Sequence, residues 1–217
     1  MANTKENKIR ILIADDHEVV RKGLKTIIAD HQDMTVTGEA ENGNDVLNIV
    51  GKQDFDLILL DFDMPEKNGL DTLIELKALY PKLPVIILSI FPEDHYGTRF
   101  LKAGASGYLG KSSASDQLVE AIRKVACGGK YVSPNLADKL VSDLNRDSDK
   151  PLHETLTDRE FQVFTMIAGG KKLKHIAEEL CLSINTISTY RGRILQKMDM
   201  KSNADVIHYA IDNHLIA

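Results

Sequence analysis

The sequence lacks the features of a membrane protein or a secreted protein. No apolar run approaches the roughly 18 to 20 residues that a membrane helix needs, and the polar start MANTKENK contains no apolar signal segment. Cysteine is scarce: Cys127 and Cys181 lie far apart and neither belongs to a CxxC pair, which argues against a disulfide scaffold and against a zinc site. We therefore expect a cytoplasmic protein whose two cysteines are reduced and partly buried.

An excess of positive charge is also absent, because the 217 residues carry a net charge of −5. The average hides an uneven distribution. Residues 1–127 contain fifteen basic and twenty acidic side chains, whereas residues 153–217 contain eight of each. In this last segment five acids precede Cys181 and four bases follow it, so a local contact with nucleic acid remains compatible with the charge.

The first 127 residues alternate short apolar runs with amphipathic stretches. Runs such as IRILIA, interrupted only by Arg10, and LILL are apolar almost continuously, which is typical of parallel strands that helices cover on both faces. The alternation predicts a doubly wound α/β domain with a five-stranded parallel sheet and five helices. The five runs are IRILIA, MTVTGEA, DLILL, PVIILS and SGYL.

The remaining sequence has a helical period. Gly128-Gly129 ends the α/β domain, and Ser133-Pro134 predicts the start of a linker helix over about 134–144. The polar segment NRDSDKP, 145–151, predicts a flexible tether. We therefore expect a linker over 128–152 and a small all-α domain over 153–217. Its four helices are predicted from a capping box at Thr157 and Glu160 to about Ala168, over about 173–180, over about 184–198, and from about Asn203.

Three carboxylates follow two strands of the predicted sheet. Asp15 and Asp16 end the first strand and Asp61 ends the third, so a sheet that pairs these strands brings the acids together at its carboxyl edge. Clustered like charges are costly unless a cation neutralises them, and an oxygen-only set suits Mg²⁺. The sequence therefore predicts a magnesium site.

Two further polar residues reach the same edge. Ser89 ends the fourth strand and Lys111 follows the fifth, which supplies a hydroxyl donor and a positive charge for phosphoryl oxygens. An aspartate beside a metal ion and a lysine can act as a nucleophile toward phosphorus. Each residue alone is weak support, since an aspartate after a strand is commonly a helix cap, but their joint order is specific.

These motifs resemble the receiver domain of a two-component response regulator. The resemblance rests on ADDH at 14–17, LLDFDMPEKNGL at 59–70, IILS at 86–89 and AGASGYLGK at 103–111. It implies Asp61 as the phosphoacceptor, Asp15 and Asp16 with the backbone of Asp63 as metal ligands, Ser89 and Lys111 as phosphoryl contacts, and Tyr108 as a switch aromatic. An ordinary edge-strand aromatic is an equally good interpretation of Tyr108.

Two positions depart from the receiver pattern. Ile90, after Ser89, is bulky where receivers often carry a small residue, and Asp63 adds a carboxylate near the phosphoacceptor. We expect both to alter the rate at which an aspartyl phosphate is hydrolysed.

The segment 184–198 has the pattern of a recognition helix. An apolar face made by Ile184, Ile187, Ile194, Leu195 and Met198 lies opposite a polar face, and Arg191, Arg193, Lys197 and Lys201 add positive charge. By itself this pattern also fits an ordinary amphipathic helix with a charged solvent face. The polar face consists of Asn185, Ser188, Thr189 and Gly192.

The context favours DNA binding. LTDREFQVFTMIAGG, IAEELCLSINTISTYRGRILQKM and KSNADVIHYA resemble the LuxR-type helix-turn-helix domain over essentially all of 153–217. The resemblance implies that the last helix, with Val206, Tyr209 and Ala210, pairs two domains on DNA. It places Thr186, Arg193 and Lys197 near phosphates and Asn185, Ser188, Thr189 and Gly192 near base edges. Gly192 is explained equally well by close approach to DNA and by simple tolerance at an exposed position.

A receiver followed by a LuxR-type domain resembles the NarL/FixJ class of response regulators. This implies a partner histidine kinase, a homodimer on double-stranded DNA, and no enzymatic activity on an external substrate. A phosphatase of the haloacid dehalogenase type is a rival hypothesis, because Asp61-Phe62-Asp63 resembles the DxD motif of that family. The family needs a further acidic motif late in the chain, whereas here Asp15-Asp16 comes first and no comparable pair follows Lys111. A DNA-binding protein that keeps an unphosphorylated receiver for dimerisation is a third hypothesis.

Overall fold

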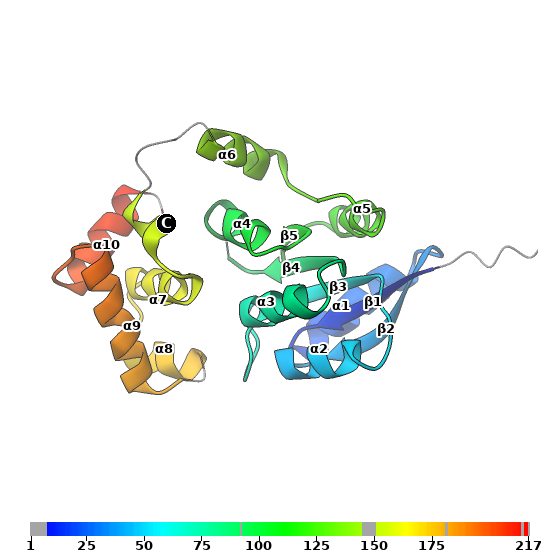
Figure 1. The fold of residues 1–217 in the computed structure, drawn as a ribbon, viewed down its shortest axis with the longest axis horizontal. Helices are drawn as coiled ribbons and strands as arrows, with labels where there is room; N and C mark the ends of the chain where they lie inside the picture. Colours follow the sequence, from blue (N-terminus) through cyan, green and yellow to red (C-terminus); the bar gives the residue numbers. More distant parts are fainter. Residues whose placement is uncertain (1–7, 92, 145–150, 181, 214, 217) are drawn as a thin grey trace, which may run out of the picture. The chain divides into compact units, whose positions relative to one another are not determined.

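The structure, a computed structural model, divides into two compact units between Leu140 and Val141 (Figure 1). The first unit is built around a sheet and the second consists of helices. Among the described residues, no helix is both long and apolar enough to cross a bilayer. The described residues are 8–91, 93–144, 151–180, 182–213 and 215–216.

The sheet of the first unit is parallel, with the strand order β2-β1-β3-β4-β5. The strands are β1 (Ile9–Ala14), β2 (Met34–Ala40), β3 (Leu57–Asp61), β4 (Val85–Ser89) and β5 (Gly107–Gly110). The order places β1 beside β3, as the acidic site requires, and confirms the predicted five-stranded fold.

Five helices cover the sheet because its strands are apolar on both faces. Every residue of β3 and β4 is buried. Ile11 and Ile13 pack in one core cluster with Ile28 of α1 and Leu118 of α5, so these two helices share a face. The helices are α1 (Glu18–Ala29), α2 (Gly43–Val50), α3 (Gly69–Leu79), α4 (Glu93–Lys102) and α5 (Ser115–Ala126).

The chain after α5 remains attached to the first unit. Tyr131 forms an isolated parallel bridge with Gly107 of β5. Helix α6 (Pro134–Leu144) begins at the predicted Ser133-Pro134, and Ser133 Oγ accepts a hydrogen bond from Leu136 N at 3.1 Å. Leu136 is fully buried beside Gly97 of α4. The compact unit therefore extends past residue 127, where we placed the end of the α/β domain.

The second unit contains a short 3-10 turn, η1 (Leu152–Thr155), which we did not predict, and four helices: α7 (Asp158–Ala168), α8 (Leu173–Glu179), α9 (Ile184–Lys197) and α10 (Asn203–Asp212). The predicted capping box of Thr157 and Glu160 is present. Phe161 and Phe164 are fully buried and form part of the core of this unit. Residues 145–150 of the predicted tether lie outside the described residues.

The prediction that Cys127 is partly buried was wrong. Cys181 lies outside the described residues, so the same prediction for it is not tested. Cys127 is a free thiol, as expected, but it is exposed. It occupies the cap position after the last turn of α5, one residue before Gly128. The buried face of α5 ends at Val125, so the side chain at 127 has no core to enter.

Candidate functional site

The acidic residues meet at the carboxyl edge of β1 and β3. The register pairs Ala14 with Leu60, so Asp15 and Asp61 leave neighbouring strands side by side. Asp15 is fully buried and Asp61 is 2% exposed, whereas Asp16 is half-buried. One ligand atom from each of Asp15, Asp16, His17 and Asp61 lies within 4.8 Å of the others. The sequence predicted the three acids but assigned no role to His17.

Lys111 compensates the charge of the two buried acids. Its Nζ lies 2.7 Å from Asp15 Oδ2 and 2.8 Å from Asp61 Oδ2. Its backbone N–H donates to the carbonyl of Ser89 at 2.7 Å, which fixes the lysine to the end of β4. Burial lowers the pKa of Lys111, but the hydrogen bonds and charges of Asp15 and Asp61 outweigh burial and raise it, so the side chain stays positive.

Asp61 is held in a state that suits a nucleophile. Burial raises the pKa of its carboxyl to about 6, against the opposing effect of Lys111, and the charge of Asp15 raises it further. A hydrogen bond with the backbone of Asp63 stabilises the carboxylate. At neutral pH the group is therefore mostly ionised, but it is poorly solvated and relies on nearby cations.

Ser89 and Tyr108 meet at the loop that follows β4. Ser89 is 1% exposed, and its Oγ accepts a hydrogen bond from Phe91 N at 3.0 Å. Tyr108 is equally buried, and its hydroxyl donates to the carbonyl of Phe91 at 2.9 Å. Burial raises the pKa of the Tyr108 hydroxyl, so it remains a donor. Both side chains thus hold the same residue of the loop.

The two residues that depart from the receiver pattern differ in exposure. Ile90 is 76% exposed, so its side chain extends into solvent beside the site. Asp63 is half-buried, and its side chain is not among the groups that converge with Asp15 and Asp61. Their effect on hydrolysis of an aspartyl phosphate stays a prediction.

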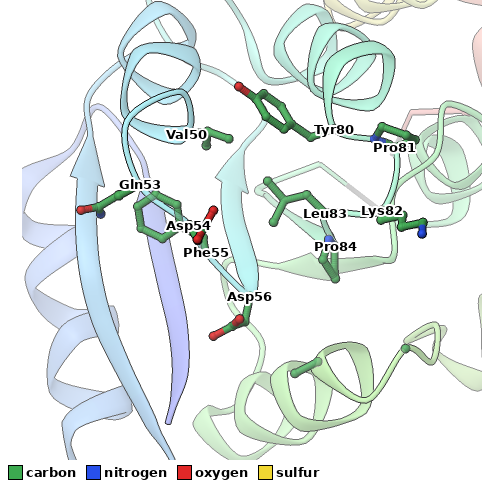
Figure 2. A pocket seen from close by; sticks show the side chains of 12 residues that line it. Val50, Gln53, Asp54, Phe55, Asp56, Tyr80, Pro81, Lys82, Leu83 and Pro84 are labelled. Atoms are coloured by element: carbon green, nitrogen blue, oxygen red, sulfur yellow. The ribbon is translucent and has the colours of Figure 1, made fainter. Parts of the chain in front are cut away.

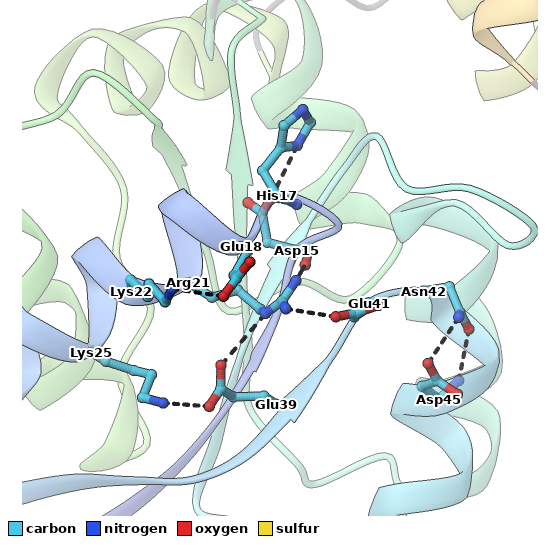
Figure 3. A network of polar contacts seen from close by, with 10 residues as sticks. All are labelled: Asp15, His17, Glu18, Arg21, Lys22, Lys25, Glu39, Glu41, Asn42 and Asp45. Atoms are coloured by element: carbon cyan, nitrogen blue, oxygen red, sulfur yellow. Dashed lines mark hydrogen bonds and ion pairs between the residues drawn. The ribbon is translucent and has the colours of Figure 1, made fainter.

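Sequence reasoning missed Arg21, which is 7% exposed and lies at the centre of a polar network (Figure 3). Its Nη1 donates to the carbonyl of Asp15 at 2.7 Å, and its Nη2 donates to Glu41 Oε1 at 2.6 Å. The guanidinium therefore ties the backbone of the acidic site to β2 and the loop after it. The available signal was a charged residue in line with Leu24 and Ile28 on the apolar stripe of α1.

Gly69 was also missed, although it lies in the quoted motif LLDFDMPEKNGL. A Cβ at this position would lie 2.1 Å from the carbonyl oxygen of Asp61 and 2.8 Å from the Cα of Phe62. Only glycine lets α3 begin so close to the end of β3. Its N–H donates to the carbonyl of Phe62 at 2.9 Å, which closes the loop that presents Asp61.

In the second unit, α9 presents a polar face. Ser183 caps the helix by accepting a hydrogen bond from Thr186 N at 3.0 Å. Ile187, Ile194 and Met198 are buried as predicted. The prediction for Ile184 was wrong: it is 49% exposed, because it begins the helix one turn before the buried stripe.

The opposite side of α9 is open. Asn185, Ser188 and Thr189 are exposed. A Cβ at Gly192 would meet no atom within 4 Å, so no neighbouring element of the unit covers the helix at this position. This is the face that the sequence assigned to base edges.

The basic residues of α9 have different surroundings. Arg193 is exposed. Lys197 Nζ lies 2.6 Å from Oε2 of Glu160, a buried carboxylate of the capping box, and Arg191 Nε donates to Asn203 Oδ1 at 2.5 Å. Lys197 and Arg191 therefore join α9 to α7 and α10 within the unit.

A shallow cavity lies at the other end of the sheet (Figure 2). Its volume is about 620 Å³, and Phe55, Tyr80, Leu83 and Pro84 are among its lining residues. These residues precede β3 and β4, so the cavity lies away from Asp61. Asp56, which also lines it, is held by Arg10 at 3.0 Å. We assign no chemistry to this cavity.

Two family models match the chain: the response regulator receiver domain over residues 11–123, and the bacterial regulatory proteins of the luxR family over residues 154–210. The chain belongs to the response regulators of the NarL/FixJ class. Response regulator GacA of Pseudomonas aeruginosa is 34% identical to this response regulator over 210 residues, which cover 96% of this chain and 98% of GacA. Transcriptional regulatory protein DegU of Brevibacillus brevis is 36% identical over 96% of this chain and 95% of DegU.

A solved structure shows the same fold as this response regulator. RcsB of Salmonella enterica serovar Typhimurium, bound to promoter P1flhDC in the presence of the phosphomimetic BeF3⁻, is 24% identical, covers 94% of this chain and 98% of its own, and has a TM-score of 0.67. The matched families and the names of the sequence relatives are those of regulators, so the expectation that the protein is not an enzyme is confirmed, and the phosphatase hypothesis is set aside.

Proposed function

We propose that a partner histidine kinase phosphorylates Asp61 and that this modification controls how the helix-turn-helix at residues 153–217 binds DNA. The observation that carries the proposal is the joint position of Asp61, Asp15 and Lys111 at one buried edge. The pairing of the receiver and luxR-family models in one chain supports the link to DNA.

The chemistry follows from the charges at this edge. A carboxylate oxygen of Asp61 attacks the phosphorus of the kinase's phosphohistidine, the P–O bond forms, and the P–N bond breaks with its electron pair leaving on the imidazole nitrogen. Lys111 stabilises the charge of the transferring oxygens, because its Nζ already lies 2.8 Å from Asp61. Ser89, at the end of β4, supplies a hydroxyl donor to a second oxygen.

Asp15, Asp16 and Asp61, with the backbone of Asp63, would hold Mg²⁺. Among the described residues, three carboxylates converge at this edge and Lys111 pairs with two of them, which leaves an excess of negative charge that fits a hard divalent ion with oxygen ligands. When bound, the ion supplies charge neutralisation for the phosphoryl group. Burial of Asp15 and Asp61 makes this neutralisation more valuable than it would be in solvent.

The phosphate connects to the rest of the fold through Ser89 and Tyr108. Both now hold Phe91, so a phosphoryl oxygen that takes the Ser89 hydroxyl would change the hydrogen bonds of that loop. This gives Tyr108 a switch role, in addition to its place on an edge strand. The affected loop precedes α4, against which the linker helix α6 packs through Leu136.

The DNA-binding surface is the open side of α9. Asn185, Ser188, Thr189 and Gly192 would face base edges, and the short side chains allow close approach. Thr186, Arg193 and Lys197 would lie near phosphates. Lys197 would keep its ion pair with Glu160 while it does so. A homodimer through α10, at Val206, Tyr209 and Ala210, would match a two-fold site in the cytoplasm.

The proposed domain organisation is a receiver over 1–127, a linker over 128–152, whose residues up to Leu140 pack with the receiver, and a DNA-binding domain over 153–217. The test measures DNA affinity across salt concentrations for the full chain, with and without acetyl phosphate and Mg²⁺, alongside mass spectrometry of Asp61. We expect an acid-labile phosphoryl adduct on Asp61 and a change in DNA affinity that Asp61→Ala abolishes.

Asp138→Asn serves as the matched control, because Asp138 is an exposed acid of α6. Phosphoryl labelling of the control should equal that of the wild type. No adduct under any donor condition would contradict the proposal. Unchanged DNA affinity and unchanged oligomeric state in Asp61→Ala would instead favour the hypothesis of an unphosphorylated receiver.

A further inference from the structure

His17 lies against the acidic site without a structural task of its own. It occupies the N-cap position of α1, where Ser, Thr, Asp or Asn normally caps the helix, yet its side chain makes no capping hydrogen bond. The side chain is 65% exposed, so packing does not hold it either. A residue that breaks a local preference in this way is often retained for function.

The imidazole is directed at the acids. His17 Nδ1 lies 2.7 Å from Asp16 Oδ1 and 3.4 Å from Asp15 Oδ1. The backbone also supports this arrangement, since His17 N–H donates to Asp15 Oδ1 at 2.9 Å. In Figure 3 the ring of His17 is turned away from the network of Arg21, Glu39 and Glu41. Its contacts are instead with the carboxylates of Asp15 and Asp16, which follow β1.

The distances from His17 Nδ1 to the two carboxylates would allow all three groups to bind the same metal ion. Ligand atoms on adjacent corners of an octahedron with bonds of about 2.1 Å lie about 3.0 Å apart. The two distances from Nδ1 bracket this value, and Nδ1 belongs to the same group of atoms within 4.8 Å as the acids.

We propose that His17 is a nitrogen ligand of the divalent site, which therefore accepts first-row transition ions such as Mn²⁺, Co²⁺ and Ni²⁺ and binds the later ones more tightly than Mg²⁺. Mg²⁺ prefers oxygen and gains little from an imidazole, whereas nitrogen ligands favour the transition ions in the order Mn²⁺, Co²⁺, Ni²⁺. The inference rests on the proposed divalent site at Asp15, Asp16 and Asp61.

The test uses the full chain without a histidine tag. Pulsed electron paramagnetic resonance of bound Mn²⁺ reports a directly coordinated ¹⁴N, and calorimetry gives the affinities for Ni²⁺ and Mg²⁺. His17→Gln removes the nitrogen ligand, and His175→Gln is the matched control because His175 is an exposed histidine of α8. His17→Ser is a second variant, which places a preferred capping residue at the start of α1 and so favours folding.

We expect ¹⁴N coupling in the wild type and in His175→Gln but not in either His17 variant. Affinity for Ni²⁺ should fall at least about tenfold in both His17 variants, the loss typical of disturbing a metal site, while affinity for Mg²⁺ should change less than about twofold. Coupling that survives in His17→Gln, or an unchanged Ni²⁺ affinity, would overturn the assignment of His17.

The two proposals fail differently. If Mg²⁺ binds and Asp61 accepts phosphate while Mn²⁺ shows no ¹⁴N coupling, the assignment of His17 is wrong and the proposed function stands. If the wild-type chain binds none of these ions and Asp61 cannot be labelled, the divalent site itself is wrong.

Discussion

The buried charge of Asp61 should cost stability that an uncharged replacement recovers. Burial raises the pKa of Asp61 from 3.8 to about 6, and this value already includes the compensation by Lys111. At about 1.4 kcal/mol per pH unit, the difference amounts to roughly 3 kcal/mol. Asp61 is 2% exposed, so solvent screening reduces this figure little. We therefore expect Asp61→Asn to stabilise the first unit by up to about 3 kcal/mol at pH 8.

The pH dependence gives the sign of the effect. Below about pH 3 the carboxyl is protonated in the folded and the unfolded chain, so the two proteins should have similar free energies of unfolding. Between about pH 4 and pH 6 the unfolded chain ionises Asp61 while the folded chain keeps it protonated, so the wild type loses stability relative to Asp61→Asn. The gap should thus open between about pH 4 and pH 6 and stay constant from there to pH 8.

Native-state hydrogen exchange of the β3 amides, in the full chain with a chelator present, measures this free energy locally. Asp138→Asn is the control and should change nothing at any pH, because Asp138 is exposed. Mg²⁺ at one hundred times its Kd for the wild type should stabilise the wild type by about 2.7 kcal/mol. The same concentration should not stabilise Asp61→Asn. An Asp61→Asn chain that is no more stable at pH 8, or a gap that is equal at pH 4 and pH 8, would refute the reasoning.

Three further substitutions test other contacts. A Cβ on Gly97 would lie 2.6 Å from a methyl group of the buried Leu136, so Gly97→Ala should cost about 1 to 2 kcal/mol and speed hydrogen exchange in α6, and Leu136→Ala in the same chain should remove the penalty. Glu160→Gln should destabilise the second unit by about 1 kcal/mol at pH 7, as urea unfolding would show, since Lys197 is partly exposed. Lys197 helps lower the pKa of Glu160 against the opposing effect of burial, so this loss should disappear as the pH falls through that lowered pKa, and a loss that persists there would contradict the ion pair. Gly192→Ala should raise helix stability by about 0.5 to 1 kcal/mol and weaken DNA affinity measured by fluorescence anisotropy, whereas unchanged affinity would favour simple tolerance at this position.

The sheet and its acidic edge could be predicted because their determinants are local. Strands such as β3 are apolar up to the terminal Asp61, and each chemically important side chain stands at a strand end or within two residues of one. Parallel pairing then brings Asp15 and Asp61 together without any knowledge of the distant chain. The capping box of Thr157 and Glu160 is equally local, and it was confirmed.

What could not be predicted depends on partners that are distant in sequence. Arg21 meets Glu41 twenty residues later, and Lys197 meets Glu160 thirty-seven residues earlier. Neither pairing produces a periodic pattern in the sequence. A single charged residue at a given helix position can face either solvent or a buried partner, and the sequence looks the same in both cases. The exposure of Ile184 and Cys127 has the same origin, since each lies just beyond the segment of helix that packs.

The attachment of Tyr131 to Gly107 and of Leu136 to α4 matters for anyone who recombines this protein with others. A chimaera joined at residue 127 would remove the Tyr131 bridge from the outer edge of β5 and uncover the part of α4 at Gly97 that Leu136 packs against. Fusion after Leu140 keeps both covered. The natural junction for swapping sensory inputs between such proteins therefore lies within α6.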